Sequence, residues 1–188
     1  MPKFIKKYNE FKLNLMDEHG LYGIGYCSNT GREFYFDMND YDLIKDYCWC
    51  EHIMQDGYCA LETSMFTEFN CKKHLRMHYL IVGKKYDHID RNPFNNRRHN
   101  LRAATNSQNS MNRSMRDDNS SGVIGVSWKK SNQKWVSYIC VDGKQIYIGI
   151  FDNKNDAIIE RLKAEIKYFG EFAPQKHLYE QYGINTTE

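Results

Sequence analysis

The chain has 188 residues, of which 41% are hydrophobic and 27% are charged, and its formal net charge is +2. This composition fits one large or two small globular domains and excludes a low-complexity or intrinsically disordered protein. The longest apolar run, residues 79–82, is far too short to cross a bilayer, which excludes a membrane-spanning protein.

The first region, residues 1–73, is predicted to be β-rich and to carry no catalytic residues. Its predicted strands are residues 23–28 and 32–36. Asn39 is expected to cap a short helix over residues 40–47. The Asp56-Gly57 pair is a strong turn signal and predicts a second hairpin.

The second region, residues 74–115, is predicted to fold in the order helix, strand, loop, strand and helix. The first four of these elements are expected at residues 74–82, 85–88, 89–98 and 101–104. Thr105 or Asn106 is expected to begin the last helix, which carries Asn109 and Arg113. This order brings the end of the first strand near the last helix.

A polar linker, residues 116–121, leads to a third region at residues 122–175, and residues 176–188 are expected to form a tail. Three antiparallel strands are predicted at residues 123–128, 134–141 and 144–151. A helix capped by Asn153 follows, and Gly170 ends it. The apolar residues expected to cover one face of the sheet are Ile158, Leu162, Ile166 and Phe169. The other face is open for binding, and the whole chain is assigned to the α+β class.

Residues 1–7 are not followed by an apolar stretch, so we expect no signal peptide and a cytoplasmic location. The six cysteines would then be reduced thiols rather than a disulfide framework. A zinc site can be drawn from Cys48, Cys50, Cys59, Cys71 and His74. Because their spacing matches no common structural zinc pattern, we expect ordinary buried thiols and no structural zinc.

Positive charge is concentrated in one stretch of the chain. Residues 71–116 contain 11 Lys or Arg against two Asp, a net charge of +9. Residues 1–70 and 117–188 have net charges of −6 and −1. A basic block of this size predicts a polyanionic partner, and a solvated basic face is the alternative. The block coincides with the residues described next, which favours the first interpretation.

The same stretch contains a carboxylate beside a histidine, Asp87-His88, followed by Asn100 and Asn109. Phosphodiester hydrolysis needs an activated water, neutralisation of the phosphate charge and help for the leaving oxygen. Asp87 and Asn109 offer the oxygen ligands that Mg²⁺ prefers, and His88 suits a general base near neutral pH. Asn100 is expected to orient His88 through a hydrogen bond to the local backbone or to the ring. These residues predict a nuclease that uses Mg²⁺ or Mn²⁺.

The spacing within this stretch resembles the HNH endonuclease motif, in particular that of phage and intron-encoded homing endonucleases whose third motif residue is Asn. The segments that carry the resemblance are Tyr86–Asp90, Asn95–Arg102 and Gln108–Arg113. The resemblance covers residues 74–114 and implies a ββα-metal fold. One departure is Asn95, where relatives often carry Asp, and we interpret it as a detail of the loop.

The resemblance implies His88 as the general base, Asp87 and Asn109 as metal ligands, and Asn100 as the orienting residue. It also implies DNA products with 5′-phosphate and 3′-hydroxyl ends. The arginines expected to contact phosphates or to order the loop are Arg97, Arg98, Arg102 and Arg113. His78 is expected either near the site or in the packing of a short helix.

The third region resembles the AP2 DNA-binding domain through Ser121–Trp128, Gly143–Asp152 and Phe169–Ala173. In that family the open sheet face lies in the major groove of DNA. The positions that match are Ser127, Lys129, Tyr138, Cys140, Gln145 and Tyr147. Several plant members have arginines in place of three of them, so a base preference cannot be carried over. The lysines expected to meet phosphates are Lys129, Lys130, Lys134 and Lys144.

The leading hypothesis is therefore a metal-dependent endonuclease that binds double-stranded DNA as a monomer and nicks or cuts it. A DNA-binding regulator with a non-catalytic HNH unit is the second hypothesis, and the intact Asp87, His88 and Asn109 argue against it. An RNA- or protein-interaction module is the third. Steep salt dependence of duplex binding separates the first two hypotheses from the third.

Overall fold

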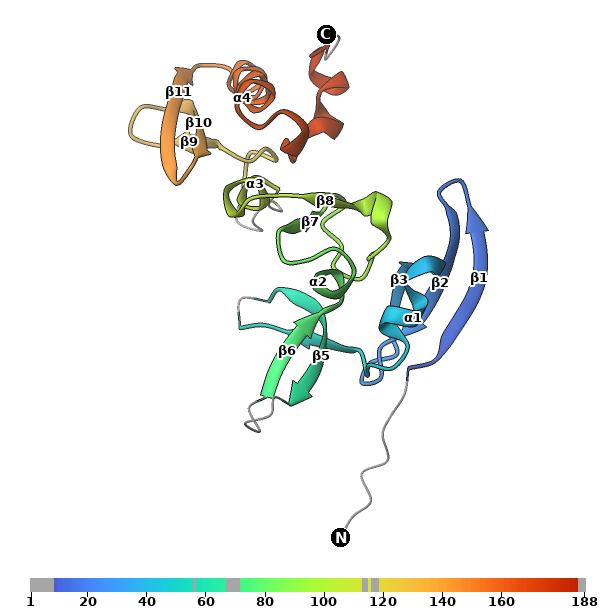
Figure 1. The fold of residues 1–188 in the computed structure, drawn as a ribbon. Coiled ribbons are helices and arrows are strands. Elements are labelled where there is room, and N and C mark those ends of the chain that lie inside the picture. Colours follow the sequence, from blue (N-terminus) through green and yellow to red (C-terminus); the bar gives the residue numbers. More distant parts are fainter. Residues whose placement is uncertain (1–8, 56, 67–71, 113–114, 116–118, 186–188) are drawn as a thin grey trace. The chain divides into compact units, whose positions relative to one another are not determined.

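The computed structural model describes residues 9–55, 57–66, 72–112, 115 and 119–185. It divides into two compact units, Met1–Ala104 and Thr105–Glu188, which are described in turn. Figure 1 shows small sheets and helices in both units, and the predicted α+β class is confirmed. No helix among the described residues is both long and apolar enough to span a membrane.

The first unit contains three small sheets, all of them antiparallel. The first sheet consists of β1 (Phe11–Asp17), β2 (Gly20–Tyr26) and β3 (Glu33–Asp37) in that order. A 3-10 turn, η1 (Met38–Asp40), and α1 (Tyr41–Ile44) follow it. The second sheet consists of β4 (Cys50–Ile53), β5 (Cys59–Phe66) and β6 (Lys72–Arg76). After α2 (Met77–Ile81), the hairpin strands β7 (Tyr86–His88) and β8 (Leu101–Ala103) pair with each other, with the turn η2 (Arg98–Asn100) before β8.

One hydrophobic core joins the first region of the chain to the hairpin of β7 and β8. Its buried members are Cys27, Phe34, Phe36, Ile44, Trp49, Leu61, Met77, Ile81, Phe94 and Leu101. Phe94 comes from the loop between β7 and β8, and Leu101 begins β8. Burying these large apolar side chains together is the main favourable term in holding the loop against the first sheet.

Backbone hydrogen bonds tie the same loop directly to β3. The amide of Tyr35 donates to the carbonyl of Phe94 at 2.8 Å, and the amide of Asn96 donates to the carbonyl of Tyr35 at 2.8 Å. The Arg32 guanidinium lies 3.9 Å from the centre of the Phe94 ring. The first region of the chain, residues 1–73, therefore supports the loop between β7 and β8.

Two local predictions in this unit are wrong. Residues 74–76 belong to strand β6 rather than to a helix over residues 74–82, because β6 pairs with β5 through residues such as Leu75 and Thr63. Only residues 77–81 are helical. Asn39 does not cap a helix over residues 40–47; it lies inside η1, and α1 has Asp40 at its N-cap position without a side-chain hydrogen bond.

The second unit begins with α3 (Asn106–Met111) and continues with a three-stranded sheet. The strands β9 (Val126–Lys129), β10 (Lys134–Val141) and β11 (Lys144–Phe151) lie in the order β11-β10-β9. Helix α4 (Lys154–Phe169) packs against this sheet (Figure 1). The side chain of Asn153 accepts from the amide of Asn155, and Gly170 lies at the C-cap, as predicted.

The buried face of α4 differs in part from the predicted one. Ile158, Leu162 and Phe169 are buried, but Ile166 is 37% exposed. Arg161 and Glu165 take the inner positions, with an Nη1–Oε1 distance of 3.1 Å, and Gln175 donates to Glu165 at 2.7 Å. Burial raises the pKa of Glu165 and lowers that of Arg161. Partnered polar groups can therefore occupy core positions that a hydrophobicity pattern assigns to apolar residues.

Residues after α4 contribute to the core rather than forming a simple tail. Three short 3-10 turns, η3 (Gly170–Phe172), η4 (Lys176–Leu178) and η5 (Glu180–Tyr182), follow the helix. Tyr179, which is 6% exposed, joins the hydrophobic core of this unit with Val123, Ile139 and Leu162. The expected region of residues 122–175 therefore shares its core with residues of the expected tail.

Candidate active site

Strand β7 carries both residues of the Asp87-His88 pair. Both side chains are buried, with 8% and 5% exposure. Asp87 lies opposite Arg102 in the register of β7 and β8, and His88 lies opposite Leu101. His88 is the last residue of the strand, and the amide of Arg91 donates to its carbonyl at 3.0 Å, so the chain turns directly after it. Successive residues on a strand point to opposite faces, so the side chains of Asp87 and His88 have different neighbours.

The His88 ring is positioned by Asn96. Its Nε2 lies 3.2 Å from Oδ1 of Asn96, whose side chain is completely buried. The Nδ2 of Asn96 donates to the carbonyl of Pro93 at 3.1 Å, which requires Oδ1 to face the histidine. An amide oxygen can only accept a hydrogen bond, so Nε2 of the neutral ring carries the proton. Nδ1 is then the nitrogen whose lone pair can accept a proton.

Burial keeps the His88 ring neutral. It lowers the pKa of His88, and the hydrogen bond to Asn96 and the charges of Asp90 and Asp87 only partly oppose this effect. His78 of α2 lies edge-on to His88, with 4.7 Å between ring centres. Burial and the nearby His88 lower the pKa of His78 to about 3. Two neutral imidazoles therefore pack together here at neutral pH. His78 is a buried residue of helix α2 and also lies beside His88, so it meets both expectations, a place near the site and a role in helix packing.

Asn100 organises the loop rather than contacting the histidine ring. Its Nδ2 donates to the Asp90 side chain at 2.9 Å and to the carbonyl of Asn95 at 2.8 Å. Its Oδ1 accepts from the backbone amide of Asp90 at 3.0 Å, and its carbonyl accepts from the amide of Ile89 at 2.8 Å. Asn100 was predicted to hydrogen-bond either to the local backbone or to the His88 ring, and the structure contains the bonds to the backbone. The ring contact belongs to Asn96, which the sequence did not single out among the asparagines of this loop.

The Asp87 carboxylate faces Arg102 across the hairpin. Nη2 of Arg102 lies 3.3 Å from Oδ2 of Asp87, which is longer than the about 2.8 Å of a close charge-assisted bond. Asp87 is thus a buried carboxylate beside a cation. A hard divalent ion prefers such an oxygen donor, so the donor chemistry fits the predicted metal.

Two of the predicted DNA-contacting arginines have intramolecular partners. The guanidinium of Arg97 is 5% exposed, pairs with Asp17 and Asp37, and lies over the Tyr22 ring. The guanidinium of Arg98 binds Asp40 at 2.6 and 3.0 Å and is half exposed. These contacts join the loop to the first sheet, which supports the loop-ordering role offered for them. A phosphate contact by either residue stays a prediction.

Asn109 lies on the exposed side of α3, in the second unit. Thr105 begins this helix as predicted: its side chain accepts from the amide of Gln108, whose side chain returns a bond to the Thr105 amide at 2.8 Å. Because Asp87 and Asn109 belong to different units, their pairing around one metal ion stays a prediction. Arg113, another predicted DNA contact, lies outside the described residues.

The predicted DNA-contacting residues of the second unit lie on the sheet face opposite α4 or at its edge. Strand alternation places Ser127, Lys129, Lys134, Tyr138, Cys140, Gln145 and Tyr147 on that face. Lys129 pairs with Lys134, Tyr138 with Tyr147, and Cys140 with Gln145. Tyr147 is 61% exposed. Lys130 is exposed after β9, and Lys134 also contacts Asp152 at 3.0 Å.

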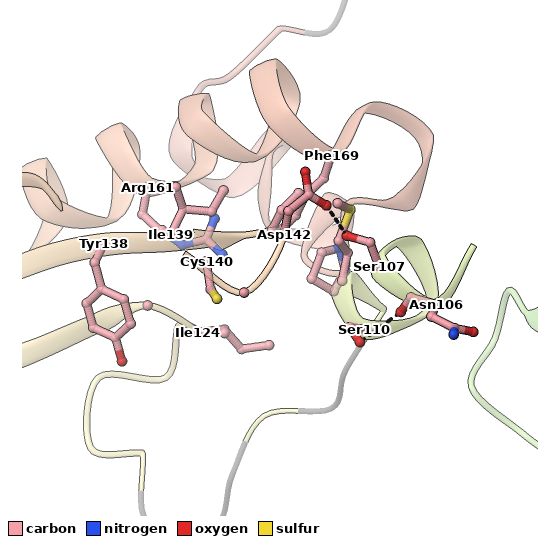
Figure 2. A pocket seen from close by; sticks show the side chains of 14 residues that line it. Asn106, Ser107, Ser110, Ile124, Tyr138, Ile139, Cys140, Asp142, Arg161 and Phe169 are labelled. Atoms are coloured by element: carbon pink, nitrogen blue, oxygen red, sulfur yellow. Dashed lines mark hydrogen bonds between the residues drawn. The ribbon is translucent and has the colours of Figure 1, made fainter. Parts of the chain in front are cut away.

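A cavity of about 590 Å³ lies between α3 and one end of this sheet (Figure 2). Tyr138, Cys140 and Arg161 are among its lining residues, as are Ser107 and Asp142, which hydrogen-bond to each other. This end of the sheet face therefore borders α3, and the expected open face is not open along its whole length.

Comparison with known proteins finds similarity over part of the chain. Residues 79–111 match a family model described as HNH endonuclease. The chain is 41% identical over 63 residues to "Protein 3.8" of Escherichia phage T7, and the match covers 34% of this chain and 52% of that protein. The chain thus spans about half the length of this relative. No solved structure matches the chain.

Proposed function

We propose that this protein is a metal-dependent DNA endonuclease of the homing or phage-associated HNH type. The observation that carries the proposal is the buried, neutral His88 ring, whose Nε2 is held by Asn96 beside the carboxylate-bearing Asp87. This arrangement lies within the residues that match the HNH endonuclease family. A neutral histidine with a fixed tautomer can accept the proton of an attacking water, and the carboxylate that precedes it in the chain is an oxygen donor for a metal ion.

His88 would act as the general base. Its Nδ1 takes a proton from the water that attacks the phosphorus, and Asn96 continues to accept from Nε2–H as the ring becomes positive. Asp87 and, from α3, Asn109 would hold a Mg²⁺ or Mn²⁺ ion through oxygen atoms. When bound, that ion would neutralise charge on the phosphate and on the leaving oxygen. Asn100 would keep the loop in the shape that holds Asn96 in place.

The sheet face of β9–β11 would bind duplex DNA, as the resemblance to AP2 domains implies. Its exposed lysines and tyrosines supply cations for phosphates and flat groups for base edges or sugars. The AP2-like assignment of residues 122–175 stays a prediction. The predicted products carry 5′-phosphate and 3′-hydroxyl ends.

Incubation of the purified protein with supercoiled plasmid tests the proposal. With Mg²⁺ or Mn²⁺ we expect nicked or linear DNA that DNA ligase can reseal, and with EDTA we expect none. The ratio of nicked to linear product shows whether one or both strands are cut. If plasmid and a phage genomic DNA library both stay intact while duplex binding is retained, the regulator hypothesis replaces this one.

A further inference from the structure

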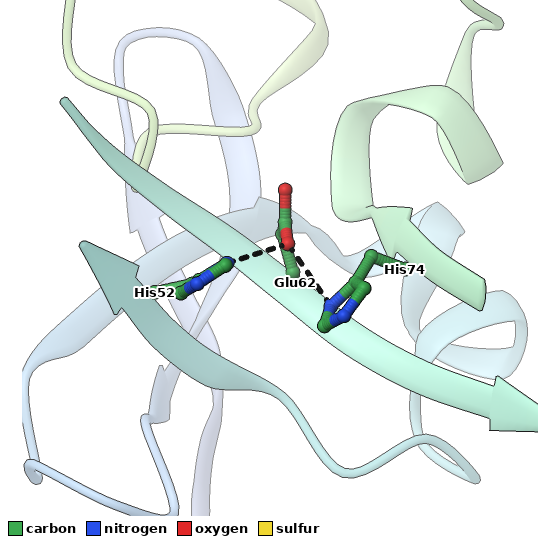
Figure 3. A group of neighbouring side chains, drawn as sticks. All are labelled: His52, Glu62 and His74. Carbon is green, nitrogen blue, oxygen red and sulfur yellow. Dashed lines mark hydrogen bonds and ion pairs between the residues drawn. The ribbon is translucent and has the colours of Figure 1, made fainter. Parts of the chain in front are cut away.

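Three potential metal ligands meet on one face of the second sheet, away from the Asp87-His88 pair in sequence. His52 lies on β4, Glu62 on β5 and His74 on β6. Glu62 pairs with Cys50 on one side and with Arg76 on the other, so His52 and His74 are each two residues from a partner of Glu62. Residues two apart on a strand share a face, and diagonal neighbours are within reach of long side chains. Figure 3 shows both rings turned toward the carboxylate.

Both rings direct the same kind of atom at the same oxygen. Nδ1 of His52 lies 3.1 Å and Nδ1 of His74 lies 3.3 Å from Oε2 of Glu62. All three ligand atoms lie within 4.8 Å of one another. Zn²⁺ binds nitrogen and oxygen at about 2.0–2.1 Å, and tetrahedral ligands at that distance are about 3.3 Å apart. The two nitrogen–oxygen distances thus match the edges of such a tetrahedron.

In this group the carboxylate is buried, and the two imidazoles are exposed to solvent. The Glu62 side chain is 7% exposed, whereas those of His52 and His74 are 50% and 45% exposed. Nε of Arg76 donates to Oε1 of Glu62 at 3.1 Å, which orients the carboxylate and leaves Oε2 directed at the imidazoles.

We propose that His52, Glu62 and His74 form a binding site for a zinc-like transition-metal dication, with water in the remaining position. Two imidazoles and one carboxylate favour Zn²⁺ over Mg²⁺, which takes oxygen ligands. The ion would link β4, β5 and β6 and stabilise the sheet that lies beside α2. This site is independent of the proposed catalytic function.

The ligands differ from the mainly cysteine set that can be drawn from the sequence. Cys48, Cys50 and Cys59 are free thiols, and Cys71 lies outside the described residues. Sγ of Cys50 lies 3.1 Å from Oγ of Ser28 rather than in the group of three. Only the histidine of that set, His74, belongs to the proposed site.

Calorimetric titration of the EDTA-treated, dialysed full chain with Zn²⁺ tests the proposal. We expect one tight site, a higher unfolding temperature on binding, and no competition from excess Mg²⁺. His52→Gln and His74→Gln should each weaken binding at least about tenfold, because each removes one of three protein ligands. Both rings are half exposed, so these variants are expected to fold, and circular dichroism of the metal-free proteins checks this.

Three control variants test whether the ion binds at these ligands and not elsewhere in the chain. Cys50→Ser, His88→Ala and His177→Gln should bind Zn²⁺ as the wild type does, since none of them alters the three ligands. X-ray absorption of the zinc-loaded wild type should show nitrogen and oxygen neighbours without sulfur. Unchanged binding in both His52→Gln and His74→Gln, loss of binding in Cys50→Ser, or a sulfur neighbour would overturn the proposal.

Discussion

Nε2 of His88 lies 3.2 Å from Oδ1 of Asn96, and Nδ2 of Asn96 in turn donates to the carbonyl of Pro93. This chain of two hydrogen bonds defines which ring nitrogen carries the proton in the neutral state. Asn96 also donates its backbone amide to Tyr35 of β3. The tautomer of the proposed base is therefore set by a loop that the first sheet holds in place.

The cleavage rate should depend on pH through His88. The base is active when neutral, and burial lowers its pKa, so the rate should fall only below the ordinary histidine range of about 6.5. Asn96→Asp places a carboxylate against Nε2, which favours the charged ring and moves the acidic limb to higher pH. Single-turnover rates against pH measure both effects. Asn132→Asp, on an exposed turn of the second unit, adds the same charge as a control and should leave the profile unchanged.

His78 should make the fold sensitive to acid. The folded protein keeps His78 neutral down to a pKa of about 3, whereas the unfolded chain binds a proton below about 6.5. Stability is therefore lost as pH falls through that window, by about 2 kcal/mol at pH 5 for this group. His78→Phe should remove this share of the difference in unfolding free energy between pH 8 and pH 5. Urea unfolding at the two pH values measures it. The exposed His177→Gln serves as control, and an equal effect in both variants would contradict the assignment.

Substitutions of two basic residues should have different effects, one on stability and the other on DNA binding. Arg97 is buried against Asp17 and Asp37, so Arg97→Met should lower the free energy of unfolding by about 3 kcal/mol. Lys129 is exposed on the sheet of the second unit, so Lys129→Met should leave stability unchanged. It should weaken duplex binding and reduce the slope of log K against log salt by about 0.9, for one phosphate contact. The reverse pattern in thermal unfolding and salt titration would show that these roles are misassigned.

Gly125 and Gly122 offer a matched pair in the second unit. Both have positive φ, +82° and +77°, so alanine at either costs about 1 kcal/mol. A Cβ at Gly125 would also lie 2.3 Å from the carbonyl oxygen of Tyr138 and 2.4 Å from Nε of Arg161, whereas none of the described atoms lies within 4 Å of a Cβ at Gly122. Gly125→Ala should therefore lower the unfolding temperature more than Gly122→Ala does. Equal effects would indicate that the backbone of β10 moves aside.

The sequence predicted the second unit well where local signals agree with the fold. The bounds of β10 and β11 and the start of α4 at Asn153 match, because alternation, turns and caps are local properties. The helix prediction for residues 74–76 was wrong because their pairing with β5 decides their conformation. A local sequence pattern does not contain that pairing. Ile166 was misplaced because a paired Arg161 and Glu165 fill the inner face of α4.

Some residues of the candidate active site could also be predicted from the sequence, and others could not. Asp87 and His88 could be found from residue type and spacing alone. Asn96 could not, because the loop offers several asparagines and only its folded path shows which one meets the ring. The group of His52, Glu62 and His74 also depends on strand register, which brings together residues from three separate segments.

The central claim, that His88 is the base of a nuclease, is tested most directly by cleavage of supercoiled plasmid with His88→Ala and His99→Ala side by side. His99 is an exposed histidine of the same hairpin and stacks on His19, so it controls for the loss of an imidazole. We predict that His88→Ala loses cleavage by about a thousandfold while retaining duplex binding, and that His99→Ala cleaves as the wild type does. Cleavage by His88→Ala at a rate close to that of the wild type would contradict the account.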